Sequence, residues 1–177
     1  DIDPETLTLD PAKVEAALLA DPRIKAILPV HLGGRVADLP ALKLLADRHG
    51  AVIIEDACHA VGTCWQDDGG AWHRVGDGSH GALTCFSFHP VKSITTGEGG
   101  AVTTNDPALA ERLALLRTHG ITREPARSQQ SPRGREGFLE RRLCVVLLLR
   151  FQCRGGTVDQ LLNRFTPQFD ARIVEPL

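Results

Sequence analysis

Two stretches of this sequence place chemically reactive side chains directly after apolar, strand-like runs. Lys92 follows an apolar run that ends at Phe88, and α/β folds gather reacting groups at the carboxyl ends of strands. Asp56, Cys58 and His59 follow the apolar, β-branched run of residues 51–54. Because side chains alternate along a strand, Asp56 and Cys58 share a face if the extended conformation persists. An amine, an acid, a thiol and an imidazole are therefore predicted at strand ends.

Each stretch also has a purely structural interpretation. Lys92 could be an ordinary surface lysine, since short motif matches carry a real risk of false positives. Asp56 could cap a turn where a strand leads into a helix. On spacing alone, these structural interpretations stay open beside the chemical ones.

Taken together, the segments 53–62 and 84–105 resemble the pyridoxal-phosphate-dependent sugar aminotransferases of the DegT/StrS type. Within that family the sequence resembles the nucleotide-sugar transaminases of pseudaminic acid biosynthesis. Residues 27–34, 75–77 and 117–123 support the resemblance, which runs from Asp1 to about Arg127. It implies that the chain is part of the large domain of a fold-type I aminotransferase, with pyridoxal phosphate as cofactor.

The resemblance also implies a role for each candidate residue. Lys92 would hold the cofactor aldehyde as a Schiff base and then shuttle the proton between substrate and cofactor. Asp56 would pair with the pyridine nitrogen and keep it protonated. His59 would lie beside the phenolic oxygen, Cys58 under the ring face, and the Ser87 hydroxyl would donate to the phosphate.

The implied reaction moves an amino group from an amino acid, with L-glutamate as the expected donor, to a keto carbon of a nucleotide-linked sugar. The expected partners are the nucleotide-sugar and amino-acid substrates, and a second copy of the chain in a homodimer if the full-length protein is intact. An inactive remnant of an aminotransferase is the alternative, because the family places further phosphate anchors outside this chain.

Alternating helix and strand patterns predict an α/β fold, a mostly parallel sheet with helices on both faces. Helices are expected to begin at Asp10-Pro11 and Asp106-Pro107, because an acidic cap precedes proline. A further helix is expected over residues 39–49, ending at Gly50. Strands are expected at 26–30, 51–55, 83–88 and 100–104, with a loop at 67–81. The inward positions of the three helices are predicted to be Val14, Ala17 and Leu18; Leu42, Leu45 and Ala46; and Leu109, Leu113 and Leu116.

Composition limits the remaining classes of function. The chain has 177 residues, 42% of them hydrophobic and 24% charged, so it is long enough to form one domain with a hydrophobic core. Its formal net charge of −2 gives no electrostatic reason to expect binding to nucleic acid or to an anionic membrane. The longest apolar run, residues 143–149, falls far short of the roughly 20 residues that a spanning helix needs. Five cysteines without framework spacing indicate free thiols and a cytoplasmic location.

The chain is expected to be a fragment, since it contains no methionine. Residues 1–127 are interpreted as a partial cofactor-binding large domain. Residues 128–177 hold half of the arginines and none of the four lysines, so this part is interpreted as an atypical tail produced by a frameshift or a fusion.

A Cys/His zinc-binding module is a different class of function to weigh. Thiol and imidazole side chains, which are zinc-compatible ligands, are concentrated in one region: Cys58, His59, Cys64, His73, His80, Cys85 and His89. Their spacing lacks a Cys-x-x-Cys pair. We therefore expect no metal site here.

Overall fold

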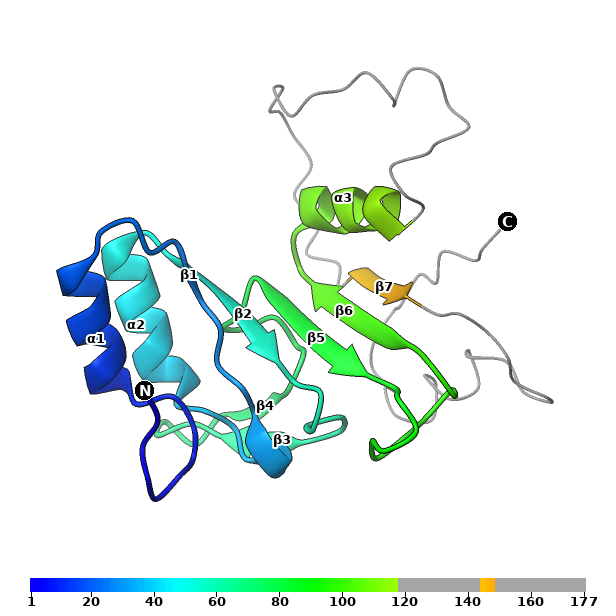
Figure 1. Cartoon of the computed structure of the whole chain (residues 1–177), viewed down its shortest axis with the longest axis horizontal. Helices are drawn as coiled ribbons and strands as arrows, with labels where there is room; N and C mark the ends of the chain where they lie inside the picture. The colour runs from blue at the N-terminus through cyan, green and yellow to red at the C-terminus, as the bar shows by residue number, and fades with distance from the viewer. Residues whose placement is uncertain (118–143, 149–177) are drawn as a thin grey trace, which may run out of the picture.

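A central five-stranded sheet organises the computed structural model, which describes residues 1–117 and 144–148 (Figure 1). The strand order is β1-β2-β5-β6-β7, and the strands are β1 (Ala26–Ile27), β2 (Val52–Asp56), β5 (Leu83–Ser87), β6 (Gly100–Thr104) and β7 (Cys144–Leu148). β1, β2 and β5 are mutually parallel, and β6 is antiparallel to both β5 and β7. All the described strands of this sheet except β6 therefore run in one direction, which confirms the predicted α/β fold with a mostly parallel sheet.

Each of the three described α-helices begins at an acidic cap, which was predicted for the first and third and not for the second. They are α1 (Pro11–Ala20), α2 (Leu39–His49) and α3 (Pro107–Arg117). Asp10, Asp38 and Asp106 each accept a hydrogen bond from a backbone N–H of the first turn, at 2.9, 3.0 and 2.8 Å, which satisfies donors that have no partner within the helix. Gly50 ends α2 in the left-handed region, with φ of 62°.

The hydrophobic core lies where α1 and α2 pack side by side at one end of the sheet (Figure 1). Leu42 of α2 and Ile53 of β2 are both almost fully buried, and Val14 and Leu18 of α1 join the same cluster. α3 lies at the other end, against β6 and β7. This core fixes β2, and with it the position of Asp56.

Two of the predicted inward helix positions are wrong. Ala17 is exposed, because only the Val14 and Leu18 face of α1 meets the core. Leu116 is 60% exposed, and the buried residue of α3 is Ala110. The apolar stripe of α3 is broad, so its pattern does not fix which side faces the sheet.

One predicted loop and one predicted strand are also corrected by the structure. The predicted loop at 67–81 contains strand β4 (Trp72–Arg74), which pairs antiparallel with β3 (Cys64–Gln66) in a separate two-stranded sheet. Asp67 closes this hairpin by accepting from Ala71 N at 2.8 Å. The strand predicted at 26–30 is regular only over β1, because Pro29 has no N–H to donate; a single bridge joins Val30 to Asp56.

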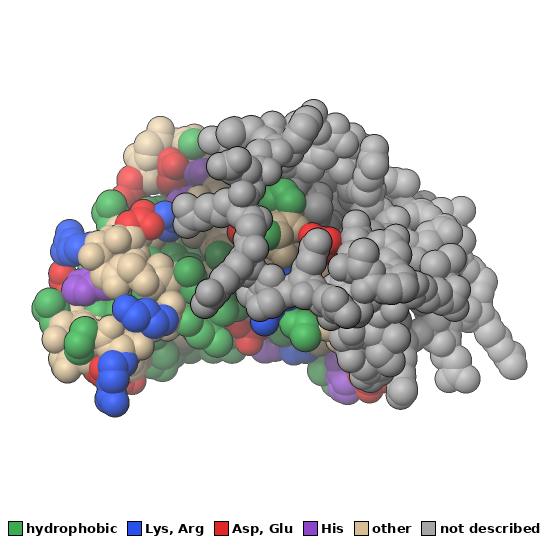
Figure 2. Space-filling view, turned by 90° about the horizontal axis from the view of Figure 1, so that it is seen from above, with side chains coloured by type: hydrophobic (Ala, Val, Ile, Leu, Met, Phe, Trp, Pro, Cys, Tyr) green, Lys and Arg blue, Asp and Glu red, His purple; other side chains and the backbone are tan. Residues whose placement is uncertain are grey.

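Hydrophobic, acidic and basic side chains are interspersed over the described part of one face of the molecule (Figure 2). Within residues 1–117 and 144–148, no helix has the length and apolar character needed to cross a membrane. The predicted boundary between residues 127 and 128 lies outside the described residues, as do His119 and Arg123. β7 falls within the predicted tail and is paired with β6.

Candidate active site

Asp56 lies at the carboxyl end of β2, and its carboxylate is held by the turn that follows. Its Oδ1 accepts from Cys58 N at 3.0 Å. Its backbone is paired on one side with the segment after β1, and Ala57 N donates to Cys85 O on the other side at 2.8 Å. The half-buried Asp56 side chain therefore projects from a backbone that is hydrogen-bonded along both edges.

The register of the sheet brings Cys85 and Ser87 to the same face as Asp56. Asp56 pairs with Cys85 across the parallel β2–β5 ladder, and paired residues project to one face. Ser87 follows two residues later on that face, because side chains alternate along β5. Its Oγ accepts from His89 N at 3.4 Å. Cys85 is a site-facing residue that the sequence analysis missed, because the register between β2 and β5 is not visible in the sequence.

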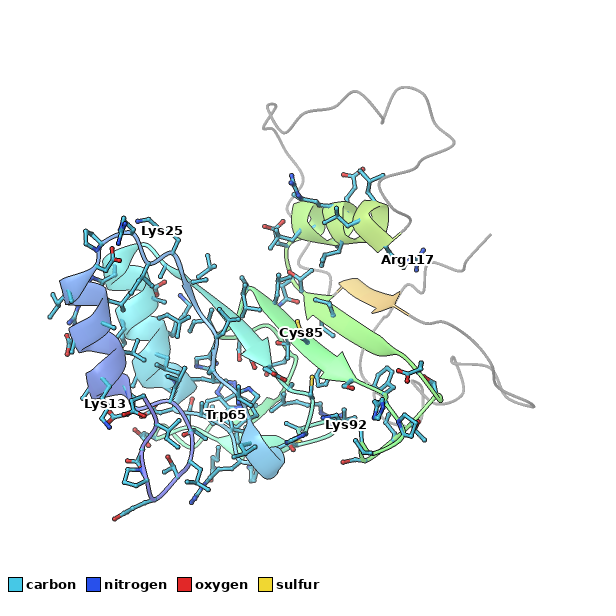
Figure 3. The ribbon with its side chains drawn as sticks, viewed as in Figure 1. Lys13, Lys25, Trp65, Cys85, Lys92 and Arg117 are labelled. Carbon is cyan, nitrogen blue, oxygen red and sulfur yellow. The ribbon has the colours of Figure 1, made fainter. Side chains whose placement is uncertain are left out.

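Lys92 lies in the turn after β5, beyond the carboxyl ends of β2 and β5 (Figure 3). The loop that carries it is tied by backbone hydrogen bonds: Lys92 N donates to His89 O at 2.9 Å, and Phe88 N donates to Gly99 O at 2.8 Å. Lys92 is half-buried. Its positive charge acts on both Asp56 and Cys58, so the amine, the acid and the thiol belong to one electrostatic site.

The environment of Asp56 favours its ionised form. Partial burial works to raise the pKa of Asp56, but hydrogen bonds from Cys58 and the positive potential of His59 and Lys92 outweigh burial. The pKa therefore lies below the ordinary carboxyl value of 3.8. At neutral pH this carboxylate is an anion able to pair with a protonated ring nitrogen.

The Cys58 thiol is kept neutral by the same surroundings. Burial, together with the neighbouring Asp56 carboxylate, raises the pKa of Cys58 to about 11, against a smaller lowering effect of Lys92. Burial and the carboxylates of Asp56 and Glu55 also raise the pKa of Cys85. These two thiols are therefore poor nucleophiles at neutral pH, and the nucleophilic candidate of the site is the Lys92 amine.

His59 is exposed at the rim of this face. Its Nδ1 accepts from Gly33 N at 3.4 Å, so the proton of a neutral ring lies on Nε2. Gly33 belongs to the 3₁₀ turn η1 (Leu32–Gly34), which therefore helps to orient the imidazole. All five predicted site residues thus lie on or after the ends of β2 and β5.

The opposite face of the same strands carries a buried polar pair that sequence reasoning also missed. His31 Nε2 lies 3.0 Å from Glu55 Oε2, and both side chains are almost completely buried. The one available signal was a carboxylate at position 55, directly after the apolar run of residues 51–54 and within the predicted strand. Its partner, 24 residues away, could not be inferred without knowing that the segment after β1 lies beside β2.

A second group of aromatic and acidic side chains lies on the β3–β4 hairpin. Trp65 stacks on His73 with ring centroids 4.7 Å apart, and His73 Nε2 lies 2.9 Å from Asp67 Oδ2. A cavity of about 380 Å³ adjoins Trp65 and Asp67, and none of the five predicted site residues lines it. Among the described residues, no group of three or more His, Cys, Asp or Glu side chains could hold a metal ion.

Comparisons with known proteins find both sequences and solved structures that are similar to this chain. The chain is 52% identical over 122 residues to the erythromycin biosynthesis sensory transduction protein EryC1 of Saccharopolyspora erythraea, which covers 67% of this chain and 31% of that relative. Helicobacter pylori PseC, an aminotransferase involved in the biosynthesis of pseudoaminic acid, matches in structure with 32% identity and a TM-score of 0.60, covering 70% of this chain and 30% of that one.

NtdA from Bacillus subtilis, solved with bound cofactor PMP, matches with 34% identity and a TM-score of 0.53, covering 65% of this chain and 24% of that one. The chain thus spans less than a third of the length of each of these relatives. Aminotransferases of the family use pyridoxal phosphate. The model of the DegT/DnrJ/EryC1/StrS aminotransferase family matches residues 1–152, and the chain belongs to this family.

Proposed function

We propose that this chain carries the central catalytic residues of a pyridoxal-phosphate-dependent sugar aminotransferase. The reaction would move an amino group from L-glutamate to a keto carbon of a nucleotide-linked sugar. The observation that carries the proposal is the convergence of Lys92, Asp56 and Cys58 in one electrostatic site at the carboxyl ends of two parallel strands. Ligands of open α/β sheets bind at such strand ends.

Asp56 fits the position opposite a pyridine nitrogen. Its carboxylate is ionised at neutral pH, since its pKa is lowered, and its Oδ1 is fixed by the N–H of Cys58 at 3.0 Å. Pyridoxal phosphate, when bound, supplies a protonated pyridine ring that draws electrons from the carbon bearing the amino group. An anion held in place by the backbone would keep that ring nitrogen protonated without moving itself.

Lys92 fits the role of a group that moves a proton at the reacting carbon. Its turn is anchored at both ends by backbone hydrogen bonds. These bonds fix the backbone position of Lys92, while its side chain can still rotate and move the amine. Cys58 would pack under the ring as a neutral thiol, since its pKa is raised to about 11. A neutral thiol does not compete with the lysine for the aldehyde.

Ser87 and His59 complete the proposed site. The Ser87 hydroxyl could donate to the cofactor phosphate, because its Oγ already accepts from His89 N and its own proton can turn elsewhere. The Nε2–H of His59 could donate to the phenolic oxygen. We also propose that the complete protein acts as a homodimer with nucleotide-sugar and amino-acid substrates, and that residues 1–127 represent part of its large domain, followed by an atypical tail.

A half-reaction assay tests this proposal. The chain is loaded with pyridoxal phosphate, its absorbance band is recorded, and L-glutamate is added while 2-oxoglutarate is measured. We expect the band to shift and one equivalent of 2-oxoglutarate to appear, and L-glutamine serves as the alternative donor. A UDP-linked 4-keto sugar should then restore the original band.

Two variants make the assay decisive. Lys92→Ala should lose both the band and the 2-oxoglutarate, whereas Lys43→Ala, on the exposed face of α2, should retain both. A wild-type chain that binds the cofactor but gives no 2-oxoglutarate would favour the inactive remnant. Retention of the half-reaction in Lys92→Ala would overturn the proposal.

A further inference from the structure

A buried histidine–carboxylate pair lies directly behind Asp56, on the opposite face of the sheet. His31 Nε2 and Glu55 Oε2 are 3.0 Å apart, with side chains 0% and 3% exposed. Ala37 N donates to His31 Nδ1 at 3.2 Å, so Nδ1 is an acceptor. The ring proton therefore lies on Nε2, and His31 donates it to the Glu55 carboxylate.

The backbone of the segment that carries His31 is hydrogen-bonded to both the C=O and the N–H of Asp56. His31 N donates to Asp56 O at 2.9 Å, and Asp56 N donates to Pro29 O at 2.9 Å. Glu55 is the preceding residue of β2, so its side chain and the Asp56 carboxylate project to opposite faces. The His31–Glu55 hydrogen bond thus joins, through side chains, two segments whose backbones also hold the Asp56 peptide.

The same pair reaches His59 through the turn η1. That turn starts directly after His31, and Gly34 N donates back to His31 O at 3.2 Å. Gly33 N, within the turn, donates to His59 Nδ1 at 3.4 Å. A shift of His31 would therefore move the Gly33 N–H that donates to His59. It would also move Pro29 O and His31 N, which are hydrogen-bonded to the Asp56 backbone.

We propose that His31 and Glu55 are a positioning pair, whose mutual hydrogen bond holds the end of β2 and the turn η1 so that Asp56 and His59 meet the cofactor in the productive arrangement. The inference rests on the proposed function. A well-packed apolar pair would serve the core equally well or better. The polar pair therefore has a function other than bulk stability, namely fixing the place of a neighbouring reactive side chain.

The test separates positioning from packing with a double variant. His31→Phe/Glu55→Leu replaces the pair by apolar side chains and leaves no buried charge. Glu55→Gln keeps an oxygen that can accept from His31 Nε2 but removes the charge. The matched control is His73→Phe/Asp67→Leu, which removes another hydrogen-bonded histidine–carboxylate pair, 2.9 Å apart, on the β3–β4 hairpin.

Two properties are measured on the full chain. One is the pKa of Asp56 without cofactor, from ¹³C NMR of aspartate-labelled protein, with the resonance identified from Asp56→Asn. The other is the Kd for pyridoxal phosphate from an absorbance titration. For the double variant we expect near-native circular dichroism, a raised pKa of Asp56, and a Kd weakened by about 10–100-fold, the loss typical of hydrogen-bond partners behind ligating side chains.

Glu55→Gln retains an acceptor for His31, and the hairpin control leaves the His31–Glu55 pair intact. Both variants are therefore expected to keep the pKa of Asp56 near its wild-type value and the Kd for pyridoxal phosphate within about threefold of wild type. The inference is overturned if the double variant keeps the wild-type pKa of Asp56 and the wild-type Kd, or if Glu55→Gln loses as much affinity as the double variant. If the double variant does not fold, Glu55→Ala takes its place in the same comparison. If the wild-type chain fails to bind the cofactor, the proposed function fails, while the pKa comparison still decides the positioning role.

Discussion

The substitution His31→Phe leaves the buried Glu55 carboxylate without its hydrogen-bond donor, and the resulting loss in the free energy of unfolding can be worked out from the structure. Glu55 is 2% exposed, and His31, its donor at 3.0 Å, is fully buried. Removing one partner of a buried pair typically costs about 3–5 kcal/mol. We therefore expect the free energy of unfolding to fall by about 3–5 kcal/mol at pH 7.

Urea unfolding at pH 7, followed by circular dichroism, measures this loss in the variant relative to wild type. The control is Asp47→Ala, which breaks the exposed Lys43–Asp47 pair of α2 and should cost about 0.3–0.5 kcal/mol. The double variant His31→Phe/Glu55→Leu should regain most of the loss, because no charge is left buried. A loss for His31→Phe under about 1 kcal/mol at pH 7, or a loss in the double variant as large as that in His31→Phe, would refute the reasoning.

Three further predictions concern single residues. Gly100→Ala should lower the stability by about 1–3 kcal/mol in thermal unfolding, because its Cβ would lie 2.7 Å from Phe86 O. Gly69→Ala, whose Cβ would come no nearer than 3.2 Å to Asp67 Oδ1, is the control, and equal effects would contradict the packing. Cys58 has a pKa of about 11, so at pH 8 it should react with iodoacetamide about tenfold more slowly than a free cysteine peptide, even though a more basic thiolate is the better nucleophile. The rate is measured by mass spectrometry, and a rate equal to that of the peptide would contradict the prediction. Asp56 has a lowered pKa, so its stabilising contribution is present above the ordinary carboxyl range and is lost as pH falls through the folded value; Asp56→Asn should therefore lose less stability than wild type between pH 5 and pH 3, and parallel curves would speak against it.

Local signals in the sequence were sufficient for the elements that carry the site. The acidic caps and the terminal glycine of α2 define helix ends through short-range hydrogen bonds and backbone geometry, so those ends were predictable. The runs before Asp56 and Lys92 are apolar enough to be strands. Because β2 and β5 are parallel, their carboxyl ends meet at one edge, and the charge of Lys92 acts on Asp56 there.

Features that depend on neighbours distant in sequence were not predictable from local patterns. Cys85 joins the Asp56 face through the register of β2 and β5, which no pattern within either strand specifies. The His31–Glu55 pair depends on the segment after β1 lying beside β2. Strand β4 is only three residues long, and its pairing depends on a turn held by the Asp67 side chain, so its segment resembled a loop.

Covalent trapping of the cofactor on a single lysine tests the central claim most directly. The chain contains four lysines, at positions 13, 25, 43 and 92, and of these only Lys92 lies near Asp56 in the proposed site. Addition of pyridoxal phosphate, reduction with borohydride and peptide mapping should place the pyridoxyl group on Lys92 alone, with the label greatly reduced in Asp56→Ala. Equal labelling of all four lysines, or labelling of Lys92 that is indifferent to Asp56→Ala, would contradict the account.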